Sequence, residues 1–126
     1  ILTDVERNAP KLYHAISAAG YLQYELNIED PEILHAVRYH TTGRANMTLV
    51  ETIVFLADFI SADRTYSGVE HMREKAYRDL YDAVVEGLAF TIADLASHRA
   101  PVHPDTVAAF NQILLQHGSH KKGKSL

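Results

Sequence analysis

The chain has 126 residues, of which 47% are hydrophobic and 22% charged, a balance typical of one globular domain rather than of a disordered chain. Its formal net charge of −4 argues against broad nucleic-acid binding, because a basic surface is normally needed to neutralise phosphates. The absence of cysteine excludes disulfides and thiolate metal sites, and it fits a reducing cytoplasm.

Helical periodicity predicts two helices in the first third of the chain. Pro10 suits the first position of a helix, and apolar residues then recur at three- and four-residue steps up to about Leu26. Asn27 is suited to the left-handed conformation that ends a helix. Asp30-Pro31 then provides a cap and a first turn. The residues of this second helix expected to face inward are Ile33, Leu34 and Val37.

A third helix is predicted after a glycine-containing loop over 41–46. Thr48 and Glu51 have the spacing of a capping box, in which the hydroxyl and the carboxylate each accept a hydrogen bond from a free backbone N–H. The apolar run over 49–60 is too short for a membrane span and is interrupted by Glu51 and Asp58. Its apolar residues predicted on the buried side are Val50, Ile53, Val54, Ala57 and Ile60.

The second half of the chain also has helical patterns and no convincing strand alternation. Ser67 is predicted to cap a short helix to about Tyr77, and a long helix over 80–95 ends before Pro101. His103-Pro104-Asp105 starts a last helix that stops at Gly118, with Val107, Phe110 and Leu114 directed inward. The sequence therefore predicts an all-α protein.

Three side chains with metal-binding chemistry have unusual contexts. Asp58 lies in an apolar stretch, where an ionised carboxylate needs a partner; an ion pair with Arg64 or a helix cap is the structural alternative. His40 ends a helix, and a histidine there is commonly stabilised by the helix dipole. His14 lies within a helix beside Tyr13 and is open to interpretation as a hydrogen-bonded core histidine. Their spacing alone does not establish a metal site.

A family resemblance gives these residues a common role. The segment 38–47 (Arg-Tyr-His-Thr-Thr-Gly-Arg-Ala-Asn-Met), followed by 55–60 and Arg64, closely resembles the bacterial HD-superfamily proteins of the YqeK type, which are symmetrical diadenosine tetraphosphate hydrolases. The likeness covers nearly the whole chain up to about Leu115. It implies an all-helical HD bundle with two metal ions, taken to be iron, with manganese or zinc as alternatives. By this resemblance His14 and His40 hold one ion, and Asp58 holds the other.

The chain departs from the family in one respect: it contains no adjacent His-Asp pair. In HD domains this dyad lies upstream of the residue matching His14. Residues 1–117 are therefore expected to be the C-terminal portion of a single HD domain, incomplete at its N-terminal side, and 118–126 a mobile polar tail. Four apolar residues are then expected to be exposed or covered by a partner chain: Leu12, Ile16, Val50 and Ile53.

The resemblance implies a metal-dependent, cytoplasmic phosphohydrolase that cleaves diadenosine tetraphosphate into two ADP, with this portion alone inactive. The substrate would be a dinucleoside polyphosphate or a nucleoside diphosphate, with no nucleic-acid or membrane partner. The residues expected to contact its phosphates are Thr41, Thr42, Gly43, Arg44 and Arg64. For Arg44 a solvated loop position, and for Arg64 a helix-end ion pair, are the structural alternatives.

Two other functions stay open at this stage. One is an HD phosphohydrolase that acts on a simpler nucleotide. The other is a catalytically inactive helical module that binds a partner or forms a homodimer. Tyrosine tolerates half-exposed interfaces, so the candidates for such a surface are Tyr21, Tyr24, Tyr77 and Tyr81.

Overall fold

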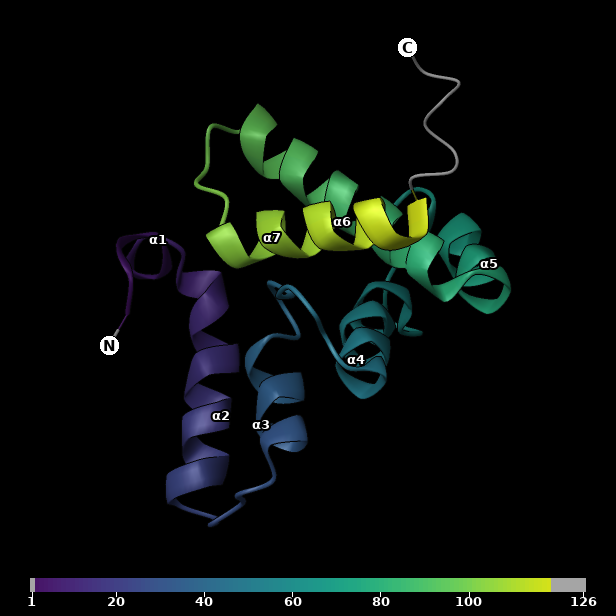
Figure 1. Cartoon of the computed structure of the whole chain (residues 1–126). Helices are drawn as coiled ribbons and strands as arrows, with labels where there is room; N and C mark the ends of the chain where they lie inside the picture. The colour runs from purple at the N-terminus through teal and green to yellow at the C-terminus, as the bar shows by residue number, and fades with distance from the viewer. Residues whose placement is uncertain (1, 119–126) are drawn as a thin grey trace.

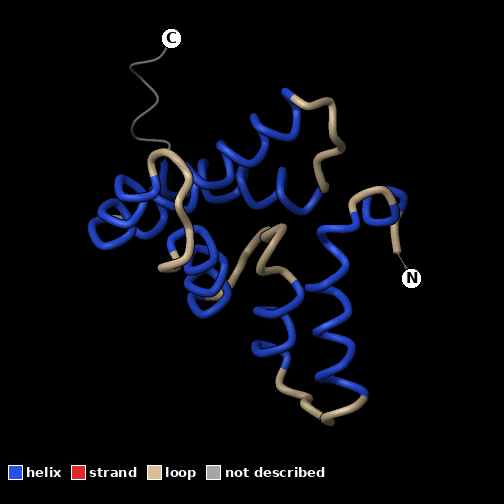
Figure 2. The backbone as a smooth tube through the Cα atoms, turned by 180° about the vertical axis from the view of Figure 1, so that it is seen from behind, coloured by secondary structure: helices blue, strands red, loops and turns tan. Residues whose placement is uncertain are grey.

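The computed structural model describes residues 2–118, and within this range the chain consists of helices and loops (Figures 1 and 2). The predicted all-α class is therefore confirmed. The elements are α1 (Asp4–Arg7), η1 (Pro10–Leu12), α2 (Tyr13–Tyr24), α3 (Pro31–Arg38), α4 (Leu49–Ile60), α5 (Val69–Arg78), α6 (Leu80–Ser97), α7 (Pro104–Ile113) and η2 (Leu114–Gly118). No helix in the described range is both long and apolar enough to cross a membrane.

The helices form two groups joined through α4. In Figure 1, α2 and α3 lie side by side below α6 and α7, and α4 lies between the two groups. α6 packs against α4, α5 and α7, so its middle turns form the centre of the core. The buried core residues there are Phe55, Leu56, Met72, Ala83, Val84, Leu88, Ala109 and Ile113.

Local signals position the helix ends as the sequence predicts. Thr48 and Glu51 form a capping box at the start of α4, and Asp30 accepts a hydrogen bond from the Glu32 N–H at 2.9 Å. Asn27 has φ 56°, the left-handed conformation expected after α2. The same capping box joins Thr3 and Glu6 in α1; this signal was present in the sequence but was missed.

The predicted buried side of α4 is wrong. The residues that turn inward are Glu51, Thr52, Phe55 and Leu56, whereas Val50, Ile53, Val54 and Ala57 are exposed and Ile60 is half-buried. The physical reason is that Arg44 binds the Glu51 carboxylate inside the fold, which fixes the rotation of the helix. The expectation that Leu12, Ile16, Val50 and Ile53 would be exposed or covered by a partner chain is confirmed for Val50 and Ile53. Leu12 and Ile16 are half-buried.

Three smaller expectations also fail. Ile33 and Val107 were expected to face inward, but both are exposed, because the buried faces of α3 and α7 are those of Ala36 and Ala109. Ser67 does not cap α5; that position belongs to Gly68, whose φ of 93° suits glycine. Apart from Gly118, the predicted tail over 118–126 lies outside the described residues.

Candidate metal centre and nucleotide site

His14 and His40, which lie 26 residues apart in sequence, meet edge to face where α2 passes the end of α3. Their Nε2 atoms are 3.1 Å apart, and their ring planes are inclined at 73°. The Nδ1 atom of His14 is 2.7 Å from the carbonyl oxygen of Lys11, and that of His40 is 2.6 Å from the carbonyl oxygen of Val37. A carbonyl only accepts, so each Nδ1 carries a hydrogen and donates it.

These hydrogen bonds define what the pair can bind. With Nδ1–H fixed on both rings, the Nε2 atoms of two neutral imidazoles face each other with lone pairs, which repel unless a proton or a metal ion lies between them. Their separation is within the reach of two metal–nitrogen bonds of about 2.0–2.1 Å each. Backbone carbonyls commonly orient metal-binding histidines through the other ring nitrogen. The donor pair therefore fits one divalent ion.

Asp58 lies near the end of α4 and is paired with Arg64. Arg64 donates from Nε to the Asp58 carbonyl oxygen at 2.8 Å and from a terminal nitrogen to the carboxylate at 2.9 Å. Both side chains are half-exposed, so the ion pair named as the alternative for Asp58 is present, although the carboxylate is not buried. Within residues 2–118 no three or more metal-binding side chains gather around one point, so Asp58 does not complete a cluster with His14 and His40.

The loop after α3 is held from both sides. The Thr41 hydroxyl is 3.4 Å from Nε2 of His14, so it lies beside the histidine pair. The backbone carbonyl of Thr42 accepts from the Thr106 hydroxyl at 2.8 Å. Gly43 is buried with φ 73°, and a Cβ there would meet the Cβ of Ala109 at 3.3 Å. Gly43 therefore allows close packing between the loop and α7.

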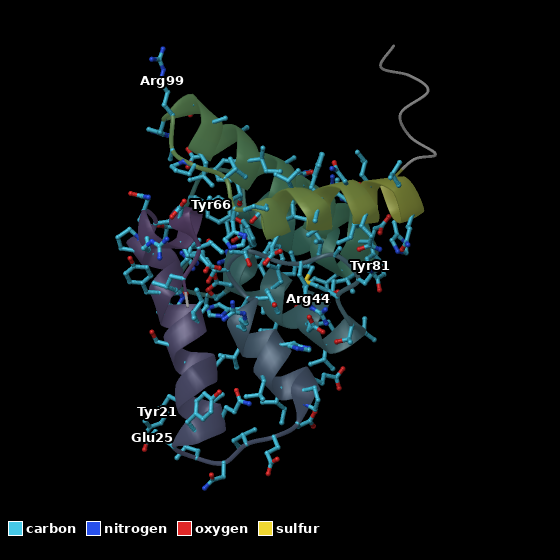
Figure 3. The ribbon with its side chains drawn as sticks, turned by 60° about the vertical axis from the view of Figure 1, so that its left-hand side comes forward. Tyr21, Glu25, Arg44, Tyr66, Tyr81 and Arg99 are labelled. Carbon is cyan, nitrogen blue, oxygen red and sulfur yellow. The ribbon has the colours of Figure 1, made fainter. Side chains whose placement is uncertain are left out.

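Arg44 points into the molecule, where Figure 3 shows it beneath α7. It forms a two-point ion pair with the buried Glu51, with nitrogen–oxygen distances of 2.7 and 2.8 Å. Burial alone would raise the pKa of Glu51, but the hydrogen bonds from Arg44 and the Thr48 N–H hold that pKa below its ordinary value. The hydrogen bond to Glu51 raises the pKa of Arg44. Arg44 is therefore a half-buried partner of Glu51, and its hydrogen bonds do not go to the histidine pair.

A buried pair that sequence reasoning missed connects the two ends of the described chain. His103 accepts from the Asp105 N–H at Nδ1 and donates from Nε2 to the Glu6 carboxylate at 2.7 Å. A hydrogen bond from the Thr3 N–H, more than the one from His103, lowers the pKa of Glu6. The local pattern His103-Pro104-Asp105 predicts that His103 starts a helix. It contains no information about Glu6, which lies 97 residues away.

A mostly apolar cavity of about 400 Å³ opens beside the histidine pair, between η1, the 41–42 loop and the start of α7. Lys11 and Thr41 belong both to its walls and to the surroundings of His14. Its other walls include Leu12, Leu95, His103 and Thr106. The volume lies within the range of small-molecule sites, so a nucleoside-sized group can enter next to the two histidines.

Solved structures and curated proteins resemble this chain, while no family model matches it. One solved structure is a Clostridium acetobutylicum protein described as a predicted HD superfamily hydrolase involved in NAD metabolism. It superposes with a TM-score of 0.86 and 30% sequence identity over 92% of this chain and 61% of its own. The chain is thus a homologue of an HD superfamily hydrolase, and it spans less than two thirds of that protein's length.

Three curated relatives are symmetrical bis(5'-nucleosyl)-tetraphosphatases. That of Halalkalibacterium halodurans is 46% identical over 113 residues, 90% of this chain and 60% of the relative. Those of Bacillus subtilis and Staphylococcus aureus are 38% and 34% identical, over 83% and 86% of this chain and 56% and 57% of their own lengths. The chain is a homologue of these tetraphosphatases and spans less than two thirds of their length, so the predicted family is confirmed.

Proposed function

We propose that the protein to which this chain belongs is a metal-dependent phosphohydrolase that cleaves diadenosine tetraphosphate symmetrically into two ADP. The observation that carries this proposal is the His14–His40 pair, with both Nδ1 atoms tied to carbonyls and both Nε2 atoms directed at each other. In a homologue of the symmetrical tetraphosphatases, this pair has the chemistry that a phosphohydrolase site requires. A cytoplasmic location is part of the proposal.

We assign His14 and His40 to one divalent metal ion and Asp58 to a second. The mixture of imidazole and carboxylate suits iron first, and manganese or zinc next. When bound, such ions polarise the phosphate and lower the pKa of a coordinated water. Arg64 pairs with Asp58, so its guanidinium offsets part of the carboxylate charge beside the proposed second ion.

The phosphate-binding residues divide into two groups. Thr41 and Arg64 are assigned to direct contact, because the Thr41 hydroxyl lies beside His14 and the half-exposed Arg64 borders Asp58. Thr42, Gly43 and Arg44 are assigned to holding the loop, because their bonds and contacts go to α7 and to Glu51. The cavity beside the histidines would receive one adenosine of the substrate.

The decisive experiment measures products and metal content together in the full-length protein. Wild type is expected to convert diadenosine tetraphosphate to ADP alone; ATP plus AMP, or activity that survives removal of metal, would refute the proposal. Asp58→Ala should abolish hydrolysis and lower metal content. Arg64→Ala should keep its metal while the barrier rises by about 2–4 kcal/mol, as when one preorganised donor is lost. The matched control is Arg78→Ala, an exposed arginine of α5.

An interaction module is the second candidate, favoured by the exposed apolar residues of α4. Tyr21, Tyr24 and Tyr77 are also exposed, and Figure 3 shows Tyr21 at the end of α2 farthest from α7. Tyr81 does not extend this surface, because its ring packs on the core and stacks with His117. Full-length protein that binds neither metal nor nucleotide, yet associates with itself, would favour this candidate.

A further inference from the structure

We propose that an aromatic groove formed by Phe59, Tyr66 and Phe90 binds the second adenosine of the dinucleoside substrate. This inference rests on the proposed function, because a dinucleoside polyphosphate has two bases and the cavity beside His14 and His40 holds one. The groove consists of two adjoining cavities of about 210 and 140 Å³, which share these three aromatic residues as walls.

The exposed ring of Phe90 offers a surface on which a purine can stack. The rings of Tyr66 and Phe90 are nearly parallel, with an interplanar angle of 21° and centroids 6.2 Å apart. Phe90 is 57% exposed, which is unusual for phenylalanine unless another group covers it. The Tyr66 hydroxyl donates to the Phe59 carbonyl oxygen at 2.8 Å, so the tyrosine ring is fixed in place. Bases stack on such aromatic faces with little dependence on sequence.

One end of the groove opens onto the proposed catalytic residues. The larger cavity is bordered by Asp58 and Arg64 as well as by the three aromatic side chains. Arg64 uses two of the five N–H donors of its guanidinium on Asp58. A base stacked on Phe90 with its ribose toward Asp58 would place the attached phosphates beside Arg64.

The other end of the groove carries polar side chains that suit the amino edge of adenine. The smaller cavity is bordered by Ser67 and by the carboxylate of Glu86, which Lys75 and His71 hold in place. Hydroxyl and carboxylate oxygens can accept hydrogen bonds from the exocyclic amino group of the base. Gly87 forms part of the wall without a side chain and leaves room next to the Phe59 ring. The groove thus offers hydrogen-bond acceptors for the edge of the base at one end, aromatic rings for stacking in its middle, and Arg64 for the phosphates at the other end.

The test compares two substrates that have the same phosphate chain. In the full-length protein, Phe90→Ala is expected to raise KM for diadenosine tetraphosphate about tenfold, in line with the loss of one stacking side chain. KM for adenosine tetraphosphate, which has a single base, should change less than twofold, and kcat should be retained for both substrates. Tyr77→Ala is the matched control, because Tyr77 is an aromatic residue 91% exposed that lines neither cavity.

A binding measurement separates this inference from the proposed activity. Adenosine added to the metal-free protein should shift the NMR resonances of the Phe90 and Tyr66 rings. Phe90→Ala should weaken the binding of adenosine in the groove. If the ring resonances do not shift, or if KM changes equally for both substrates, the groove is not the second adenosine site, even if wild type makes two ADP. If adenosine shifts the ring resonances but the protein does not hydrolyse diadenosine tetraphosphate, the proposed function is refuted and the groove is still a nucleoside-binding site.

Discussion

Glu51 shows how a single buried charge can control a helix. Its side chain is 1% exposed, yet it keeps its charge because Arg44 supplies two hydrogen bonds and the Thr48 N–H a third. An unpaired carboxylate at this depth would be too costly, so the fold depends on Arg44 being in place. The same arginine is the one that the family resemblance assigned to phosphate.

Replacing Glu51 with glutamine should lower the free energy of unfolding at pH 7 by about 3 kcal/mol, because the guanidinium loses its charged partner. The pKa of Glu51 is below its ordinary value in the folded chain, so the pair stabilises at pH above the unfolded-state pKa of about 4.3. That stability is lost as the pH falls through the folded-state value. The free energy of unfolding can be measured with denaturant between pH 3 and 7, a range of about four pH units. It should change less with pH for Glu51→Gln than for wild type.

The control for this prediction is Glu70→Gln, which removes a similar ion pair with Arg73 from the exposed surface of α5. Exposed ion pairs of this kind contribute little to the free energy of unfolding. An equal loss of stability in the two variants would show that burial of Glu51 is not the cause.

At the scale of elements, α4 has its apolar residues on two opposite faces, and only one of them is buried. Ile53→Lys should change the free energy of unfolding by less than about 0.5 kcal/mol, because Ile53 is 49% exposed. Phe55→Ala, two residues further along, should cost about 3–5 kcal/mol through the cavity it leaves in the core. Chemical denaturation of the 126-residue chain compares the two, and similar losses would show that both faces are packed.

Gly87 and Gly43 are expected to respond in opposite directions to the same added methyl group. Gly87 lies within α6, and a Cβ there would be 3.5 Å from the Phe59 ring, an ordinary contact, so Gly87→Ala should add about 0.5–1 kcal/mol of stability. Gly43→Ala should cost about 2 kcal/mol, because its φ is positive and Ala109 is close. Thermal unfolding of the two variants checks both signs.

At the scale of the whole molecule, the site within residues 2–118 provides too few ligands for two metal ions. His14 and His40 supply two ligands to one ion and Asp58 supplies one to the other, whereas hydrolytic two-metal sites hold their ions about 3.5–4 Å apart with shared ligands. Residues 1–126 alone are therefore expected to show little hydrolysis of diadenosine tetraphosphate. Supplying the part of the H. halodurans homologue that this chain does not match should restore metal uptake and activity together.

The assay for this prediction combines ADP release with metal analysis of the purified chain. Strong metal-dependent cleavage by residues 1–126 alone would contradict the assignment and direct attention to His35 or His71 as further ligands. Neither is isolated: His35 lies 3.4 Å from Arg44, and His71 pairs with Glu86 at 3.2 Å. Their replacement would therefore also disturb these contacts.

The sequence by itself determined the features that depend on neighbours within about four residues. The all-α class, the capping box of Thr48 and Glu51, the left-handed Asn27 and the start of the last helix at His103 were all predictable, because caps and turns satisfy backbone groups locally. The exception was the capping box of Thr3 and Glu6, whose pattern was equally local and was overlooked.

Only the tertiary structure decided which residues meet across long separations in the chain. The contact of His14 with His40, the partner of His103 and the rotation of α4 depend on how helices pack. The spacing of apolar residues predicts a helix but does not show which of two apolar faces is buried. In α4 the buried face is the one that carries Glu51, which pairs with Arg44 inside the fold. The same holds for the aromatic groove, because Phe59, Tyr66 and Phe90 come together only where α6 crosses α4.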